Sequence, residues 1–136
     1  MEKAAFKLDN YQFPKATIDF TKAEEKNEIE LHFAPEGQFE KDKRLFRLHF
    51  SVRICLNNSK EPAMEVHCVA EYSFQNEIEF ADIPPYFYSN SIAILFPYVR
   101  AFISNLSLQA NFPPMILPTM NLSDLGEELK AHTQAI

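Results

Sequence analysis

The sequence predicts an α+β fold in which a four-stranded antiparallel sheet packs on one long helix, followed by a short C-terminal helix. Two observations support this class: apolar and polar residues alternate in the first half of the chain, and a helical apolar pattern follows in the second. The 136 residues fit a single domain, 1–136, and 46% hydrophobic and 13% aromatic residues can form a substantial core. Disorder is therefore not expected.

The clearest strand lies at residues 46–56, where apolar and polar residues alternate strictly. The same alternation appears at 29–33 and 64–74, and a weaker version at 16–21. The segments APEGQFEKDK and NNSKEP are typical of turns. Such short connections favour antiparallel pairing, because a parallel return needs a longer crossover.

A non-periodic crossover, QNEIEFADIPPYFYSN, leads into the long helix. Apolar residues from Ile92 to Ala110 recur at helical spacing and form one stripe, and Pro97 fits if it lies in the first turn. One small sheet cannot cover a second stripe as well, so that stripe predicts a subunit contact. The alternative is that the crossover folds over it. The second stripe consists of Ile94, Tyr98, Ala101 and Leu108.

The last segment predicts a short helix that begins at Asn121. Asn is a favoured N-cap, and Asp124 three residues later suits a helix N-terminus. Gly126 and the polar end KAHTQAI predict fraying.

Charge and composition oppose several classes of function. The net charge of −6 disfavours binding to nucleic acid or anionic lipid, which needs a cationic surface. The N-terminus MEKAAFKLDNYQF lacks the apolar core of a signal peptide, and no apolar run approaches the roughly 18 residues that span a bilayer. We therefore expect a cytoplasmic protein without direct membrane insertion. Cys55 and Cys68 fall on opposite strand faces, so no intrachain disulfide is expected.

Motifs for catalysis, cofactors and metals are not apparent. The two glycines, Gly37 and Gly126, lie in unrelated places and exclude phosphate loops and dinucleotide fingerprints. His32, His49 and His67 share the polar face of the predicted sheet, without the close spacing of zinc motifs. We expect no metal, no cofactor and no enzymatic activity.

The second half of the chain closely resembles the C-terminal signature of the SecB export chaperones. The resemblance rests on ILFPYVR at 94–100, Ile103-Ser104, Phe112-Pro113-Pro114, Leu117, Pro118 and Asn121-Leu122. It implies a homotetramer, built as a dimer of dimers with the long helices between dimers. The second stripe of the helix would then lie at an interface between subunits. The apolar face of the fourth strand, at Val66, Cys68 and Ala70, would lie at an interface as well.

The resemblance also implies apolar grooves that hold unfolded client chains. Prolines fix the backbone and remove hydrogen-bond donors, so the segment 112–118 can stay open and present side chains. Aromatic residues and Met place few geometric demands on a bound sequence. The expected groove residues are Ile29, Leu31, Phe33, Tyr86, Phe87, Tyr88, Phe112, Met115, Ile116, Leu117 and Met120.

The leading hypothesis is an ATP-independent holdase for unfolded polypeptides, such as preproteins for Sec-dependent export. In the family, acidic residues help dock the SecA motor, and the matching positions here are Thr17, Thr21, Glu65 and His67, of which only Glu65 is acidic. Coupling to SecA is therefore expected to be weak. One alternative is a chaperone dedicated to a partner such as an antitoxin. Another is a carrier that binds a small apolar ligand between sheet and helix.

Overall fold

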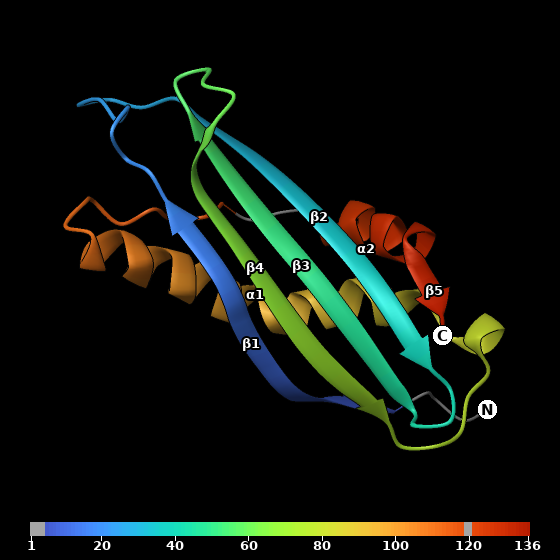
Figure 1. Ribbon diagram of the computed structural model, residues 1–136. Helices are drawn as coiled ribbons and strands as arrows, with labels where there is room; N and C mark the ends of the chain where they lie inside the picture. The colour runs from blue at the N-terminus through green and yellow to red at the C-terminus, as the bar shows by residue number, and fades with distance from the viewer. Residues whose placement is uncertain (1–4, 119–120) are drawn as a thin grey trace.

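The computed structural model describes residues 5–118 and 121–136 of the chain (Figure 1). Its elements are β1 (Phe6–Ile18), β2 (Ile29–Glu40), β3 (Leu45–Leu56), β4 (Pro62–Phe74), η1 (Phe80–Asp82), α1 (Pro85–Gln109), α2 (Leu122–Ala131) and β5 (Thr133–Ala135). The strand order is β1-β4-β3-β2-β5, with antiparallel pairs except for the parallel pair of β2 and β5. The predicted α+β fold with one long and one short helix is confirmed.

The hydrophobic core lies between the sheet and α1, which crosses behind the strands in Figure 1. Strands β3 and β4 turn one face inward, and the inward residues are nearly all fully buried. The predicted first stripe of α1 meets them through Leu95, Val99 and Ile103, each buried. The Tyr72 hydroxyl donates a 2.6 Å hydrogen bond to the carbonyl oxygen of Ser91, which fixes α1 against β4.

Strand β1 begins ten residues earlier than the alternation predicts. Its pairing with β4 is interrupted between Leu8 and Asn10 and between Gln12 and Lys15. Each such bulge shifts the two-residue period, so the apolar residues do not form one regular pattern in the sequence. The strand lies at the edge of the sheet, where Pro14 is tolerated because one side needs no donor.

Strand β2 continues through most of the segment that predicts a turn. Residues Ala34–Glu40 pair with β3, and only the following residues form the turn. Pro35 is accommodated because it lies near the sheet edge. The second predicted turn is confirmed: Asn57 and Asn58 adopt φ values of 55° and 61°, a conformation that Asn accepts more readily than most residues.

Helix α1 begins at Pro85, so the crossover is shorter than predicted. Proline suits the first helical position, where no intrahelical donor is needed. Pro97 consequently lies inside the helix rather than in its first turn, at an exposed position. The helix continues there because water can reach this side of it.

By length and composition α1 could cross a membrane, with a mean hydropathy of 1.4 over its most apolar window. This corrects the expectation that no run is long enough. Scattered Ser and Asn residues interrupt the apolar runs of α1, but they do not lower its mean hydropathy below that of a helix that could cross a membrane. The buried residues of α1 pack on the sheet, as in the core helix of a folded domain.

The C-terminal end is ordered and adds a fifth strand. Asn121 caps α2 as predicted: its side-chain oxygen accepts from the backbone N–H groups of Ser123 and Asp124 at 3.1 and 3.3 Å. The predicted fraying is wrong, because β5 pairs with Gly37–Phe39 of β2. The Thr133 hydroxyl also donates to the carbonyl oxygen of Leu129 at 2.6 Å.

Candidate client-binding surface

The segment 111–118, called the linker here, follows α1 without regular secondary structure. Asn111 ends the helix with φ 62°, and the N–H of Phe112 bonds to the carbonyl oxygen of Ser107 at 3.1 Å. Farther along, the Ser104 hydroxyl of α1 donates to the carbonyl oxygen of Met115 at 2.9 Å. The linker is therefore fixed to α1 at these two places. Figure 1 shows it returning along the helix towards α2.

The linker buries one large apolar side chain and exposes others. Leu117 is buried in the core, whereas Ile116 is 66% exposed and Phe112 is 37% exposed. The ring of Phe112 lies 4.4 Å from that of Phe20, which follows β1. An apolar surface is thus held in place without the linker having to collapse onto the core.

The N-terminal half of β2 supplies a second apolar surface. Ile29 is 55% exposed, and Leu31 and Phe33 are half-buried on the inner face of the sheet. The ring of Phe33 lies 5.8 Å from Phe50 and 6.3 Å from Phe96, so α1 supports it from behind.

Strand β2 also has an unpaired edge beside these residues. Gly37 donates to the carbonyl oxygen of His132, and the carbonyl oxygen of Phe39 accepts from Ile136. Odd-numbered residues therefore point their backbone groups away from β3. Within the part of the chain that the structure describes, β5 pairs only with Gly37–Phe39. On this edge, no residue of 5–118 or 121–136 pairs with the backbone donors and acceptors of Ile29, Leu31 and Phe33.

The structure divides the predicted groove residues into three sets. Ile29, Tyr86, Phe112 and Ile116 are exposed, and Leu31, Phe33 and Met115 are half-buried. Phe87, Tyr88 and Leu117 are buried in the core, and Met120 lies outside the described residues.

The buried pair at the start of α1 requires a correction. Because α1 begins at Pro85, Phe87 lies in its first turn, with its ring within 4.9 Å of those of Phe6, Phe46 and Phe74. Burial also raises the pKa of the Tyr88 hydroxyl. Neither ring offers surface to a client. Tyr86 stays exposed, but it lies at the opposite end of α1 from Phe112, and a helix of 25 residues is about 37 Å long.

The second stripe of α1 is not covered by the crossover. Ile94, Tyr98, Ala101 and Leu108 are all exposed. Strand β1 shields part of this side of α1. The sequence pattern did not predict this contact, because it did not predict the first half of β1. Tyr11 stacks on Tyr98 at 4.6 Å between ring centroids, and Phe13 stacks on Phe102 at 4.0 Å.

The predicted interface residues of the fourth strand lie elsewhere. Val66, Cys68 and Ala70 are fully buried inside the single chain, because β4 is an interior strand whose inner face is covered by α1. Burial raises the pKa of the Cys68 thiol to about 12. These residues are core residues of one subunit, and the expectation of an interface there is wrong.

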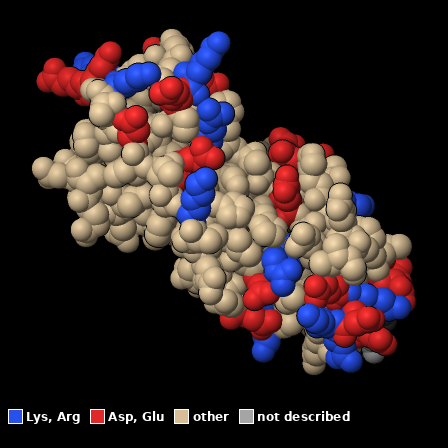
Figure 2. Space-filling view, viewed as in Figure 1, with Lys and Arg blue, Asp and Glu red and all other residues tan. Residues whose placement is uncertain are grey.

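Three of the four positions predicted to face SecA, namely Thr17, Glu65 and His67, lie on the outer face of the sheet. Thr17 pairs with Glu65 across β1 and β4, and Thr21 donates hydrogen bonds to Asp19 just after β1. His67 is half-buried. Figure 2 shows charges of both signs on this side, densest at the two ends of the molecule.

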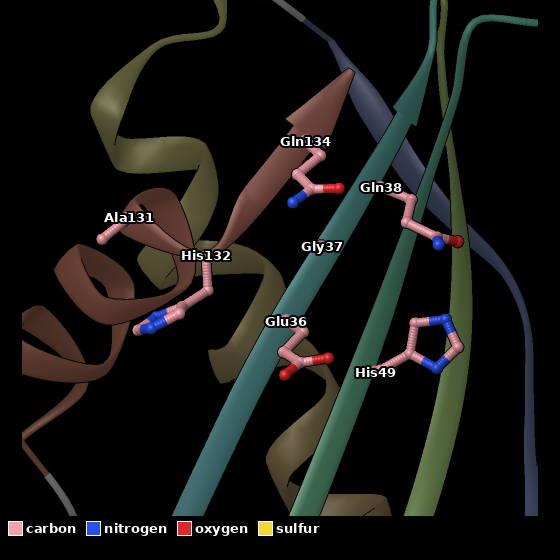
Figure 3. Close-up of a pocket in the computed structure, with 7 residues that line it drawn as sticks. All are labelled: Glu36, Gly37, Gln38, His49, Ala131, His132 and Gln134. Carbon is pink, nitrogen blue, oxygen red and sulfur yellow. The ribbon is translucent and has the colours of Figure 1, made fainter. Parts of the chain in front are cut away.

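The space between sheet and helix does not support a small-ligand site, because the side chains that face it are fully buried against one another. A polar pocket of about 370 Å³ lies instead beside β2 and β5, lined by Glu36, Gly37, Gln38, His49, Ala131, His132 and Gln134 (Figure 3). Among residues 5–118 and 121–136, no three His, Cys, Asp or Glu side chains gather closely enough to hold a metal ion.

Several known proteins are similar to this chain, among them three from different organisms. An uncharacterized protein of Methanocaldococcus jannaschii is 46% identical over 57 residues, 42% of this chain and 33% of that protein, so the match spans about a third of the curated relative. A SecB-like chaperone of Mycobacterium tuberculosis, Rv1957, was solved in complex with a ChAD peptide from the HigA1 antitoxin. It is 14% identical with a TM-score of 0.67, over 85% of this chain and 90% of that chain. A protein of unknown function from Streptococcus agalactiae is 9% identical with a TM-score of 0.47, over 87% of this chain and 100% of that one.

A family profile settles the classification that the 94–122 signature predicts. The family described as "Preprotein translocase subunit SecB" matches residues 9–132. The fold, with its long helix behind an antiparallel sheet, agrees with that of the SecB-like chaperone. The chain therefore belongs to the SecB family.

Proposed function

We propose that the chain is an ATP-independent holdase that captures unfolded polypeptides in the cytoplasm. The observation that carries this proposal is a pair of exposed apolar surfaces, one on the linker and one on the N-terminal half of β2, where β2 has an edge that no described residue pairs with. Ile29, Phe112 and Ile116 are its most exposed members. Membership of the SecB family supports the same function.

The two features of this surface suit different parts of an unfolded chain. The edge of β2 can bond to the backbone of any extended segment, because backbone groups are the same in every sequence. The apolar side chains add about 25 cal/mol for each Å² that a client removes from water. Neither interaction demands a particular client sequence, so this surface suits clients of many sequences.

The class of client has two candidates. Unfolded preproteins are the first, and an antitoxin-like partner is the second. The complex of the SecB-like chaperone with an antitoxin peptide supports the second candidate.

We expect weak, salt-sensitive attraction to SecA, because Thr17, Thr21 and His67 stand where the family resemblance implies acidic contacts. Titrating SecA from the same cell against the chaperone at low and high salt checks this, and tight binding that survives high salt contradicts it.

Client capture can be measured with a reduced, unfolded protein that aggregates on dilution. The chaperone should suppress light scattering at stoichiometric amounts without ATP, and it should not bind the native form of that protein. The double substitution Ile29→Asp and Ile116→Asp should weaken capture strongly, because it places two charges in the contact surface. A single Ile116→Ala substitution should weaken it modestly, since it removes only part of the apolar area.

A matched control is available at the other end of the molecule. Ile136 is 61% exposed, close to the 66% of Ile116, but it lies beside β5. Ile136→Asp should leave capture unchanged. Equal capture by the wild-type chain and the double variant, with both folded, would overturn the proposed surface.

A further inference from the structure

Two histidines that are far apart in the sequence meet on the outer face of the sheet. The Nδ1 atom of His49 on β3 lies 3.4 Å from the Nε2 atom of His67 on β4, with ring centroids 5.5 Å apart. They are diagonal neighbours, because His67 pairs directly with Ser51. We propose that His49 and His67 form a two-histidine site for a divalent late transition metal ion such as Zn²⁺ or Ni²⁺.

The separation of the two nitrogens fits such an ion. Metal–nitrogen distances of about 2.0–2.1 Å place the ion between atoms 3.4 Å apart with a nitrogen–metal–nitrogen angle of about 110°, close to tetrahedral. Imidazole nitrogens are donors that zinc, copper and nickel prefer over magnesium or calcium. The ion would replace the hydrogen bond that now joins the two rings.

The sheet holds both rings in place before any ion arrives. Strands β3 and β4 are interior strands that pair over most of their length. The Ser51 hydroxyl lies 2.9 Å from the Nδ1 atom of His67. A serine hydroxyl can accept a hydrogen bond from the Nδ1–H group of His67, and in that tautomer Nε2 is free to bind metal.

Room and negative charge lie beside His49. Glu36 pairs with His49 across β2 and β3, and both line the pocket of about 370 Å³ shown in Figure 3. Water can reach His49 through this space. The Glu36 carboxylate lowers the electrostatic cost of placing a dication there.

Two cations are also near the pair. Arg47 on β3 is bound to Glu71 at 3.0 Å, so its charge is partly neutralised. Lys15 pairs with His67 across β1 and β4 and is exposed to solvent, which screens its charge. Lys15→Gln should therefore strengthen metal binding only slightly.

Isothermal titration of the untagged chain with ZnCl₂ and with NiCl₂ at neutral pH tests the site. We expect saturable binding of one ion per subunit and a rise in Tm with added metal, because the ion binds only the folded pair. His67→Gln should remove both effects. Ser51→Ala should reduce metal affinity by about 10–100-fold through the loss of the ring's orienting hydrogen bond.

His32→Gln is the matched control, since His32 lies on the same outer face beside Glu30 and should leave binding unchanged. His67→Gln retains both thiols, so metal bound by Cys55 or Cys68 would persist in it. Equal zinc affinity in the wild-type chain and in His67→Gln, each with a normal circular dichroism spectrum, would overturn the site. Client capture should not change with metal, because the site and the apolar surface lie on opposite faces of the sheet.

Discussion

Burial acts on the side chains of the two sheet faces in different ways. On the inner face it raises the pKa of the Cys68 thiol to about 12, so this thiol stays protonated and unreactive at neutral pH. On the outer face, burial lowers the pKa of His49, and the neighbouring His67 and Arg47 lower it further, while Glu36 raises it. A half-buried histidine among charges therefore titrates differently from an exposed one.

The lowered pKa of His49 predicts a pH dependence of stability. Unfolded histidine titrates near about 6.5, so below that pH the unfolded chain binds more protons than the folded chain. The free energy of unfolding should therefore fall as the pH drops below about 6.5 towards the folded pKa of His49. His49→Gln should reduce this slope in urea titrations with EDTA present. His32→Gln controls for the loss of one histidine, and an identical slope in His49→Gln would contradict the prediction.

At the scale of elements, the C-terminal segment depends on both glycines of the chain. Gly126 lets α2 lie against α1, because a Cβ atom there would come within 2.9 Å of the backbone of Ser89. Gly37 lets β5 lie beside β2, because its Cβ would come 2.5 Å from both Phe46 and Thr133. The two residues lie far apart in the sequence, but they hold the same segment in place.

Replacing either glycine with alanine should destabilise the chain. Alanine favours a helix over glycine by about 1 kcal/mol, so Gly126→Ala would be stabilising if propensity decided the outcome. We expect a loss of about 1–3 kcal/mol instead, since the backbone of Ser89 cannot move aside easily. Urea unfolding measures this, with Glu127→Ala on the exposed side of α2 as the control. A more stable Gly126→Ala variant would refute the close packing of α1 and α2.

At the scale of the whole molecule, the exposed stripe of α1 is the clearest candidate for a subunit contact. Its side chains stay exposed after β1, the crossover and the linker have all packed. Exposed apolar side chains that follow one side of a helix are typical of protein interfaces. We propose that this stripe joins subunits in a homotetramer, as the SecB family membership also suggests.

The proposed homotetramer predicts different effects for substitutions in the exposed stripe of α1 and for a substitution in the core of the subunit. Ile94→Asp with Leu108→Asp should reduce the mass measured by light scattering and leave the circular dichroism spectrum unchanged, because both side chains are exposed in one subunit. Cys68→Asp should unfold the subunit, since it buries a charge in the core. A monomeric mass for the unmodified chain would contradict the assignment of the stripe.

The sequence by itself determined the class of fold and the family. Strict alternation at 46–56 and 64–74 and the helical stripe that includes Leu95 and Val99 depend only on which residues face the core. The cap at Asn121 was equally predictable, because its hydrogen bonds reach only three residues along the chain. Signals of this kind are local and periodic.

Only the tertiary structure decided which candidate residues are available at the surface. Phe87 and Cys68 are apolar residues that the sequence predicts at a groove and at an interface, but packing buries both. Ile116 and Leu108 remain exposed. The bulges of β1, the pairing of β5 and the meeting of His49 with His67 depend on register between strands distant in sequence. A pattern within one segment carries no information about such pairings, because the partner strand and the covering helix determine them.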